Sequence, residues 1–266
     1  MQTTDFDDLL RRTRRRLLTM HHDSGVGHIG GNLSSLDAMM VVFHQLMQAG
    51  DRFVLSKGHS AGALYATLWS LGRLDDAALK TFHKDATLLP GHPPSHGIAD
   101  IAFATGSLGH GLSLAAGTAL AWKFQRKSGH VWCLTSDGEW QEGSTWEALI
   151  FARHHRLGNL TVLVDHNRLQ GFGSTGEVAS MAPLGDKLRG FDVAVETVDG
   201  HDPVQLRRLL AEPATAPRVV VMETVKGHGV GFMENRMEWH YLPLTAAQYA
   251  LAMQELDAVE TEAVAS

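Results

Sequence analysis

Residues 136–173, SDGEWQEGSTWEALIFARHHRLGNLTVLVDHNRLQGFG, contain the pattern that decides the fold. They read as the end of a strand, a helix, a second strand with the sequence LTVLVD, and a polar turn. Two apolar strands joined by one helix are typical of a βαβ unit, in which parallel strands bring their carboxyl ends to one edge of the sheet. The segment therefore predicts part of a parallel sheet.

The rest of the chain repeats this alternation. Strands are expected near 52–56, 130–136, 160–165, 192–198 and 218–225, and helices near 5–22, 33–48, 58–72, 111–124, 143–156 and 203–211. Ser34 or Ser35 would lie near the start of the second helix, and Asp75 would cap a further short helix. Alternating strands and helices indicate an α/β fold with three layers: a mostly parallel sheet with helices on both faces.

No internal repeat, low-complexity tract or long linker interrupts this pattern. We therefore predict a single domain over residues 1–266, with a loosely held tail after about residue 252. A loop rich in glycine, proline and histidine covers residues 88–111, and long ordered loops of this kind are often functional.

Composition argues against several classes of function. The formal net charge is −6, so a nucleic-acid partner has no bulk electrostatic support. The single cysteine, Cys133, lies in an apolar strand and reads as a buried, inert thiol. A run of arginines between residues 11 and 16 favours a solvated helix face or a subunit contact. The N-terminus has no apolar signal core and no stretch reaches membrane-spanning length, so we expect a cytoplasmic protein without a membrane partner.

Two polar residues follow neighbouring strands of the predicted sheet. Asp137 comes after VWCLTS, and Asn167 comes shortly after LTVLVD. Their carboxylate and amide oxygens are hard ligands that suit magnesium, which often takes its remaining ligands from phosphates and water. The helix that begins near Glu142 offers backbone N–H groups to a diphosphate. Spacing alone leaves a second interpretation open, in which Asp137 caps a helix and Asn167 lies in a turn.

The same segment resembles the thiamine diphosphate motif of transketolases, which begins with Gly-Asp-Gly and ends in an Asn pair or Asp-Asn about thirty residues later. Three further segments resemble the same family in the same order: DRFVLSKGHSAGALYATLWSLG, GHPPSHGIADIAFATGSLGHGLSLAAG and ETVKGHGVGFMENRMEWHYLPLT. The likeness covers about residues 10 to 250. It implies the thiamine diphosphate-binding fold and transfer of a two-carbon ketol unit from a ketose to an aldose or other acceptor.

The resemblance also implies roles for individual residues. Thiamine diphosphate would bind with Mg²⁺, or with Ca²⁺ or Mn²⁺ in its place, and the metal ligands would be Asp137, Asn167 and the main-chain carbonyl of Leu169. The predicted cofactor-binding residues are His59, Gly106, Ser107, Leu108, Asp137, Gly138, Glu139, Asn167 and His240. The predicted catalytic residues are His28, His59, His92, His240 and Glu142, of which Glu142 would lie near a subunit interface.

The histidines suit ketol transfer because sugar hydroxyls must gain and lose protons, and neutral histidines do both near physiological pH. The pairs His21–His22 and His154–His155 are instead expected at the surface or at helix ends, since a soft-metal site would need more cysteine or a tighter histidine cluster.

The chain departs from the family pattern at several positions. Ser136 replaces the first glycine of Gly-Asp-Gly, and His166 replaces the usual Asn or Asp before Asn167, where its side chain could point away. Ser107 stands where many members have proline, His110 where many have glutamine, and Ile29 where proline commonly follows the histidine. These three changes lie near the expected substrate and cofactor, so substrate choice stays open.

Transketolases take a glutamate for the aminopyrimidine from a second domain that follows the one matched here. We therefore expect this chain to be the N-terminal subunit of a split transketolase. A separate C-terminal subunit with the pyrimidine-binding domain would complete it, in an α2β2 assembly that acts on a sugar substrate.

Two alternatives remain. The chain could be half of another thiamine diphosphate enzyme, such as a 2-oxoacid dehydrogenase or a protein like deoxyxylulose-phosphate synthase. It could also be a degenerate homologue without catalytic activity, although the retained polar residues argue against that.

Overall fold

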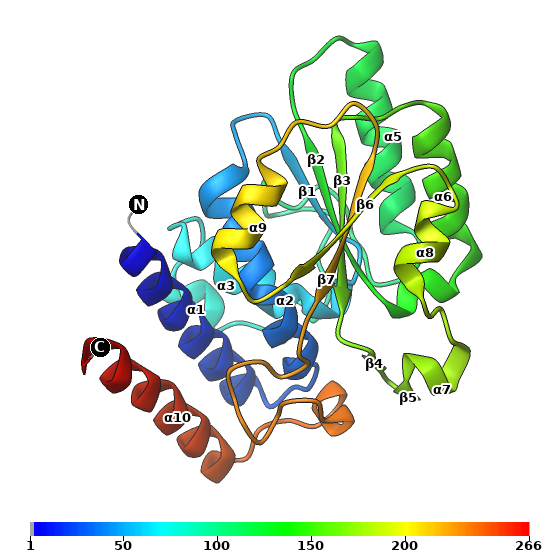
Figure 1. Cartoon of the computed structure of the whole chain (residues 1–266). Helices are drawn as coiled ribbons and strands as arrows, with labels where there is room; N and C mark the ends of the chain where they lie inside the picture. The colour runs from blue at the N-terminus through cyan, green and yellow to red at the C-terminus, as the bar shows by residue number, and fades with distance from the viewer. Residues whose placement is uncertain (1–2, 266) are drawn as a thin grey trace.

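The computed structural model describes the backbone of residues 3–265 and the side chains of residues 5–258. Its centre is a five-stranded sheet in the order β1–β2–β3–β7–β6, with every neighbouring pair parallel (Figure 1). The strands are β1 (Arg52–Leu55), β2 (Val131–Ser136), β3 (Leu160–His166), β6 (Ala194–Asp199) and β7 (Arg218–Glu223). The five strands predicted from the sequence are therefore all present, and the three-layer α/β fold is confirmed.

Alternate side chains of each strand enter two separate cores, as a pleated sheet requires. In β2, Trp132 and Leu134 belong to one core, whereas Val131 and Cys133 belong to the other. The Cys133 thiol is fully buried, and burial raises its pKa well above the usual value, so it is an inert core residue. Because helices cover both faces of the sheet, β2, β3 and β7 are largely apolar and buried, whereas the edge strand β6 is partly exposed.

The first core lies beneath α1 (Thr3–Ser24), α2 (Ile29–Val41), α3 (Ala61–Ser70), α9 (Pro203–Leu210) and α10 (Ala246–Ala265). Every residue of α2 is buried, and a π-helical turn extends it to Leu46. This helix begins before the predicted start, and Ser34 lies inside it. Its glycines read as a turn in the sequence, but here they let the helix approach neighbouring side chains closely.

The second core lies beneath α5 (Gly111–Phe124), α6 (Gly143–His154) and α8 (Leu184–Arg189). The helices predicted at 111–124 and 143–156 are confirmed. Asp75 caps the short helix α4 (Asp76–Leu79), since its carboxylate accepts the Ala78 N–H at 2.7 Å. Among the described residues, no helix is both long and apolar enough to cross a membrane.

Two irregular regions lie at the carboxyl ends of the strands. A small antiparallel hairpin, β4 (Leu169–Gln170) with β5 (Gly173–Ser174), follows β3 and leads into α7 (Thr175–Ala179). The long loop predicted between α4 and α5 is present. Residues 253–265 lie in α10, where Ala252 and Leu256 are buried in the first core. The single domain and the loosely held tail stay predictions.

Burial gives two histidines, His21 and His130, a low pKa. His21 lies in the last turn of α1, which agrees with the expected helix end, but it is 1% exposed rather than at the surface and packs against Phe82. Burial lowers the pKa of His21 to about 4, and burial likewise lowers the pKa of His130 to about 4. Because an unfolded histidine titrates near pH 6.5, the unfolded chain binds more protons than the folded chain between about pH 4 and 6.5.

Stability should therefore be lost as the pH falls through that window. We expect each such histidine to cost about 2 kcal/mol of unfolding free energy between pH 7 and 5. Urea unfolding at both pH values measures the loss, and His130→Gln should reduce it. An equal pH dependence in the wild type and this variant would contradict the assignment to His130.

Candidate active site

The turn after β3 brings the oxygens of Asp137 and Asn167 to one place. Asp137 Oδ2 accepts the Arg168 N–H at 2.6 Å, and Asn167 Oδ1 accepts the Leu169 N–H at 3.1 Å. Both side chains thus bond to consecutive backbone groups of the same turn. Asp137 is buried, and burial, followed by the charge of Asp165, raises its pKa to about 6. A carboxylate in such a position gains from a nearby cation.

Asp165 determines which way the Asn167 amide points. Asn167 Nδ2 donates to Asp165 Oδ2 at 3.1 Å and to Ser34 Oγ at 3.2 Å. Because a carboxylate can only accept, the amide nitrogen must face Asp165, which turns Oδ1 toward the Leu169 side. The amide oxygen is therefore available to a ligand on the same side as Asp137.

Asp165 itself is held by a buried ion pair that no sequence pattern revealed. Its carboxylate pairs with the Lys57 ammonium, and both side chains are 0% exposed. Ser34 and Thr224 also donate to it. Although burial opposes ionisation, Lys57 and these donors keep the Asp165 pKa below its usual value. The Lys57 ammonium also donates to the Gly31 carbonyl at 3.0 Å, which ties α2 to the strand ends.

A cavity of about 170 Å³ opens over these groups. Seven of the predicted site residues line it: His59, Leu108, Asp137, Gly138, Asn167, Leu169 and His240. A side chain at Gly138 would meet Gln170 Oε1 at 3.1 Å, so this glycine allows close approach of a ligand to the backbone. Gln170 also lines the cavity, and its Nε2 is buried without a hydrogen-bond partner among the described residues.

Histidines from four segments gather beside the cavity. The His28 ring lies 5.1 Å from His240, 5.8 Å from His59 and 6.4 Å from His92, measured between ring centroids. His28 has a left-handed backbone with φ 65°, and its N–H donates to the His240 carbonyl at 3.0 Å. Asn32 donates to the carbonyls of both His28 and His59, so one buried amide links these segments.

Burial keeps the four histidines neutral. It is the main cause that lowers the pKa of His28 to about 4 and of His240 to about 3. It also places the pKa of His59 well below the usual value and lowers that of His92. Neighbouring positive charges add to the effect. The cluster can thus donate and accept hydrogen bonds without adding a positive charge.

The remaining predicted residues lie around this cavity rather than in its lining. The Glu139 carboxylate is fully buried and accepts from Ser56 Oγ and from the N–H groups of Gly109 and Ser136. Glu139 therefore fixes the loop that carries Gly106–Leu108, and its carboxylate is already engaged. Glu142 is exposed at the start of α6.

The three predicted residues of this loop, Gly106, Ser107 and Leu108, have different surroundings. Gly106 has φ 130°, and a side chain there would meet His92 Cδ2 at 2.4 Å. Leu108 lines the 170 Å³ cavity, whereas Ser107 lines a separate cavity of about 530 Å³ together with His110. Leu108 and Asp137 therefore line the same, smaller cavity, whereas Ser107 lines the other one.

Lys226 is a second residue that the sequence patterns did not single out. Its side chain is 1% exposed and lines the cavity. Its ammonium donates to the Leu169 carbonyl at 3.2 Å and lies 2.8 Å from His240 Nδ1. Burial, with Lys57 as the next cause, lowers the Lys226 pKa to about 8. The motif ETVKGHGVG contains this lysine, but only its contact with His240 marks it as part of the site.

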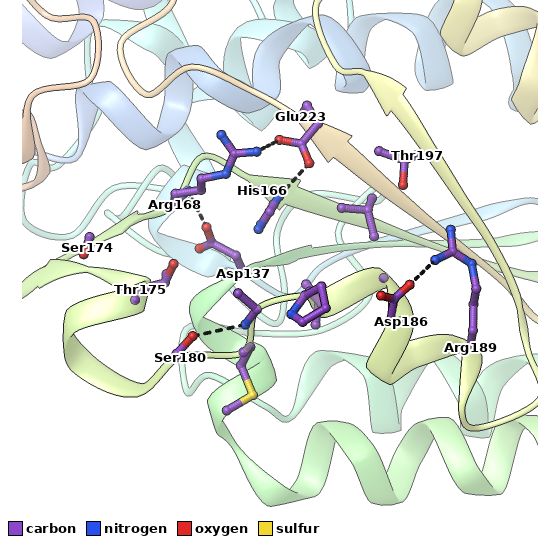
Figure 2. A pocket seen from close by; sticks show the side chains of 17 residues that line it. Asp137, His166, Arg168, Ser174, Thr175, Ser180, Asp186, Arg189, Thr197 and Glu223 are labelled. Atoms are coloured by element: carbon purple, nitrogen blue, oxygen red, sulfur yellow. Dashed lines mark hydrogen bonds and ion pairs between the residues drawn. The ribbon is translucent and has the colours of Figure 1, made fainter.

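A larger cavity of about 590 Å³ lies on the other side of Asp137 (Figure 2). Figure 2 shows His166 and Arg168 both reaching Glu223. His166 Nδ1 lies 3.0 Å from Glu223 Oε1. The side chain of His166 is thus bound to Glu223, and His166 does not line the smaller cavity, which Asn167 lines.

One further group has the geometry of a metal site among the described residues. Asp37, His201 and His228 have ligand atoms within 4.8 Å of one another. However, Asp37 already pairs with Arg14, and His201 Nε2 accepts the Val225 N–H at 2.9 Å. The group therefore reads as a satisfied polar cluster, and Arg14 lies at a buried ion pair rather than on a solvated face.

Known proteins resemble this chain over nearly its whole length. The family model described as "Transketolase, thiamine diphosphate binding domain" matches residues 12–262. The 6-deoxy-6-sulfo-D-fructose transketolase subunit SqwG of Clostridium sp. strain MSTE9 is 35% identical over 245 residues, which cover 88% of this chain and 89% of that subunit. A subunit of the apulose-4-phosphate transketolase of Phocaeicola vulgatus is 34% identical, covering 96% of this chain and 95% of that protein.

Longer relatives match over less than half of their length. Human transketolase is 34% identical over 94% of this chain, which corresponds to 41% of the human protein. The crystal structure of a transketolase from Campylobacter jejuni gives a TM-score of 0.87 at 24% identity, over 97% of this chain and 43% of that one. The structural likeness shows a shared fold.

Proposed function

Since this chain belongs to the transketolase thiamine diphosphate-binding domain family, we propose that it holds the diphosphate and the metal of the cofactor for transfer of a two-carbon ketol unit. The observation that supports this best is the cavity lined both by Asp137, Asn167 and Leu169, which offer oxygen ligands, and by the neutral histidines His59 and His240. In this arrangement a bound anion and a reacting sugar would lie side by side.

The residues present fit a hard divalent ion and a diphosphate. Asp137, Asn167 and the Leu169 carbonyl supply three oxygens around one turn, which suits Mg²⁺ with its other ligands from phosphate and water. Gly138 leaves room for close approach, and the unpartnered Gln170 Nε2 offers a donor. Thiamine diphosphate, when bound, supplies the thiazolium that acts as electron sink.

The histidines would handle the protons of the substrate. His28, His59 and His240 lie close enough to contact one small molecule, and their low pKa values keep the rings neutral, so that together they can donate hydrogen bonds to sugar hydroxyls and accept hydrogen bonds from them. His92 lies beside this group of histidines, and its ring packs against Gly106. Three clustered histidines favour ketol transfer over a 2-oxoacid dehydrogenase or a protein like deoxyxylulose-phosphate synthase, because sugars present more hydroxyls.

A partner chain would complete the site. Among the described residues that line the cavity, none is a glutamate, and the Glu139 carboxylate is already bonded to Ser56 and two backbone groups. Two relatives that match this chain over most of their own length are named as transketolase subunits. We therefore propose a separate C-terminal subunit that supplies the glutamate, with exposed Glu142 near the contact. Magnesium as the metal, an α2β2 assembly, a cytoplasmic location and a sugar substrate belong to the same proposal.

The test is a calorimetric titration of thiamine diphosphate into the chain, with and without Mg²⁺. The titration is then repeated after adding the candidate partner subunit, which is the protein encoded beside this chain. We expect tight binding only with both Mg²⁺ and the partner, and ketol transfer between sugar phosphates only in that mixture. Thiamine without its diphosphate is the control ligand and should not bind. Absence of Mg²⁺-dependent binding in every mixture would support a degenerate homologue, and turnover by the single chain would refute the split site.

A further inference from the structure

Lys226 has an unusual set of hydrogen-bond partners for a buried cation. Its ammonium carries three N–H donors and no acceptor. Among the described residues, no carboxylate lies within ion-pair distance of it, in contrast to Lys57, which pairs with Asp165. The partners are instead a carbonyl oxygen of Leu169 and a ring nitrogen of His240.

The packing around the Lys226 side chain leaves it little freedom. A side chain at Gly30 would lie 3.0 Å from Lys226 Cγ and 3.2 Å from Trp239 Cβ, so α2 and the segment before His240 press on the lysine stem. The Lys226 carbonyl accepts the Asn235 N–H at 2.9 Å, which fixes its backbone. The packing of the fold therefore holds the Lys226 ammonium in one position.

This geometry determines the state of His240. Because an ammonium can only donate, His240 Nδ1, at 2.8 Å, must be the acceptor. A neutral imidazole that accepts at Nδ1 carries its proton on Nε2. We propose that Lys226 is a positioning residue that, as an ammonium, holds His240 as the Nε2–H tautomer.

The tautomer assigns different tasks to the histidines. His240 Nε2 faces the Gly171 turn, since a side chain at Gly171 would lie 3.5 Å from it. His240 thus offers an N–H donor at the cavity, suited to a phosphate or hydroxyl oxygen. The proton acceptor of the resting site must then be another group. His28 is placed for this task, because its Nδ1 is buried without a partner among the described residues.

The inference rests on the proposed function, because it assigns roles to histidines of that site. Its test, however, needs neither cofactor nor partner. The full chain, labelled with ¹⁵N-histidine, would be studied at pH 7.5 by long-range ¹H–¹⁵N correlation, which distinguishes protonated from unprotonated ring nitrogens. His240→Asn identifies the His240 signals by their loss.

We expect wild-type His240 to show a protonated Nε2 and an unprotonated Nδ1. Lys226→Met, which keeps the length and removes the donors, should move His240 toward a mixture of tautomers, whereas Lys226→Arg should restore the wild-type pattern. Lys123→Met is the control: this exposed lysine bonds the His155 carbonyl at 2.6 Å, and its loss should leave His240 unchanged.

A protonated Nδ1 in the wild type would overturn the proposal by itself, so the test holds even if Lys226→Met does not fold. An unchanged His240 pattern in a folded Lys226→Met would also overturn it. Failure of the calorimetric titration with the expected tautomer present would remove the proposed function but leave this hydrogen bond in place.

Discussion

Asp137→Asn should abolish Mg²⁺-dependent binding of thiamine diphosphate while leaving the fold intact. The substitution removes the negative charge nearest the proposed metal but keeps the size of the side chain. Loss of a charged metal ligand should cost more than the roughly 10- to 100-fold in metal affinity that residues behind the ligands contribute. Calorimetry with Mg²⁺ in the reconstituted complex measures the effect.

Stability should change little in the same variant. The Asp137 carboxylate accepts hydrogen bonds from the N–H groups of Gly138 and Arg168. An asparagine amide can accept only one of these two hydrogen bonds, and losing the other costs about 1 kcal/mol. Relief of the repulsion from Asp165, which helps to raise the Asp137 pKa to about 6, opposes that loss. We therefore expect the unfolding free energy to shift by less than about 2 kcal/mol.

Asp75→Asn is the matched control. It makes the same chemical change at a carboxylate that caps α4, where asparagine caps equally well. Binding should equal that of the wild type. If Asp137→Asn retained Mg²⁺-dependent binding, the metal assignment would be wrong. Loss of binding together with a collapsed melting transition would show that Asp137 supports the fold instead.

Asp165→Ala should have the largest effect on stability. It leaves the Lys57 ammonium fully buried without its carboxylate, and breaking one side of a buried ion pair costs about 3–5 kcal/mol. The variant also removes the acceptor that orients the Asn167 amide. Urea unfolding should therefore show a large loss, and Mg²⁺-dependent cofactor binding should weaken in whatever fraction remains folded.

A double variant that carries neither charge separates these two effects. Lys57→Met combined with Asp165→Leu removes both charges and should recover much of the unfolding free energy, because neither charge is then left alone. Cofactor binding should stay weak in the double variant, since the Asn167 amide still lacks its partner. Recovery of binding along with stability would show that Asp165 acts only through the fold.

The sequence predicted the sheet, most of its helices and the proximity of Asp137 and Asn167. Those predictions rest on local patterns. A buried strand is continuously apolar over its own few residues, and a helix that returns to the sheet brings Asp137 and Asn167 to neighbouring strand ends. The glycines of α2 misled the same reasoning, since a wholly buried helix has no polar face to mark where it starts.

The tertiary structure alone assigned the supporting residues of the site. Lys57 and Asp165 lie 108 positions apart, and Lys226 meets the Leu169 carbonyl from 57 positions away. A buried charge depends on which partner the packing places beside it, and no local pattern contains that distance. For the same reason the sequence could propose His240 for the site, but only the contact with Lys226 decides where its proton lies.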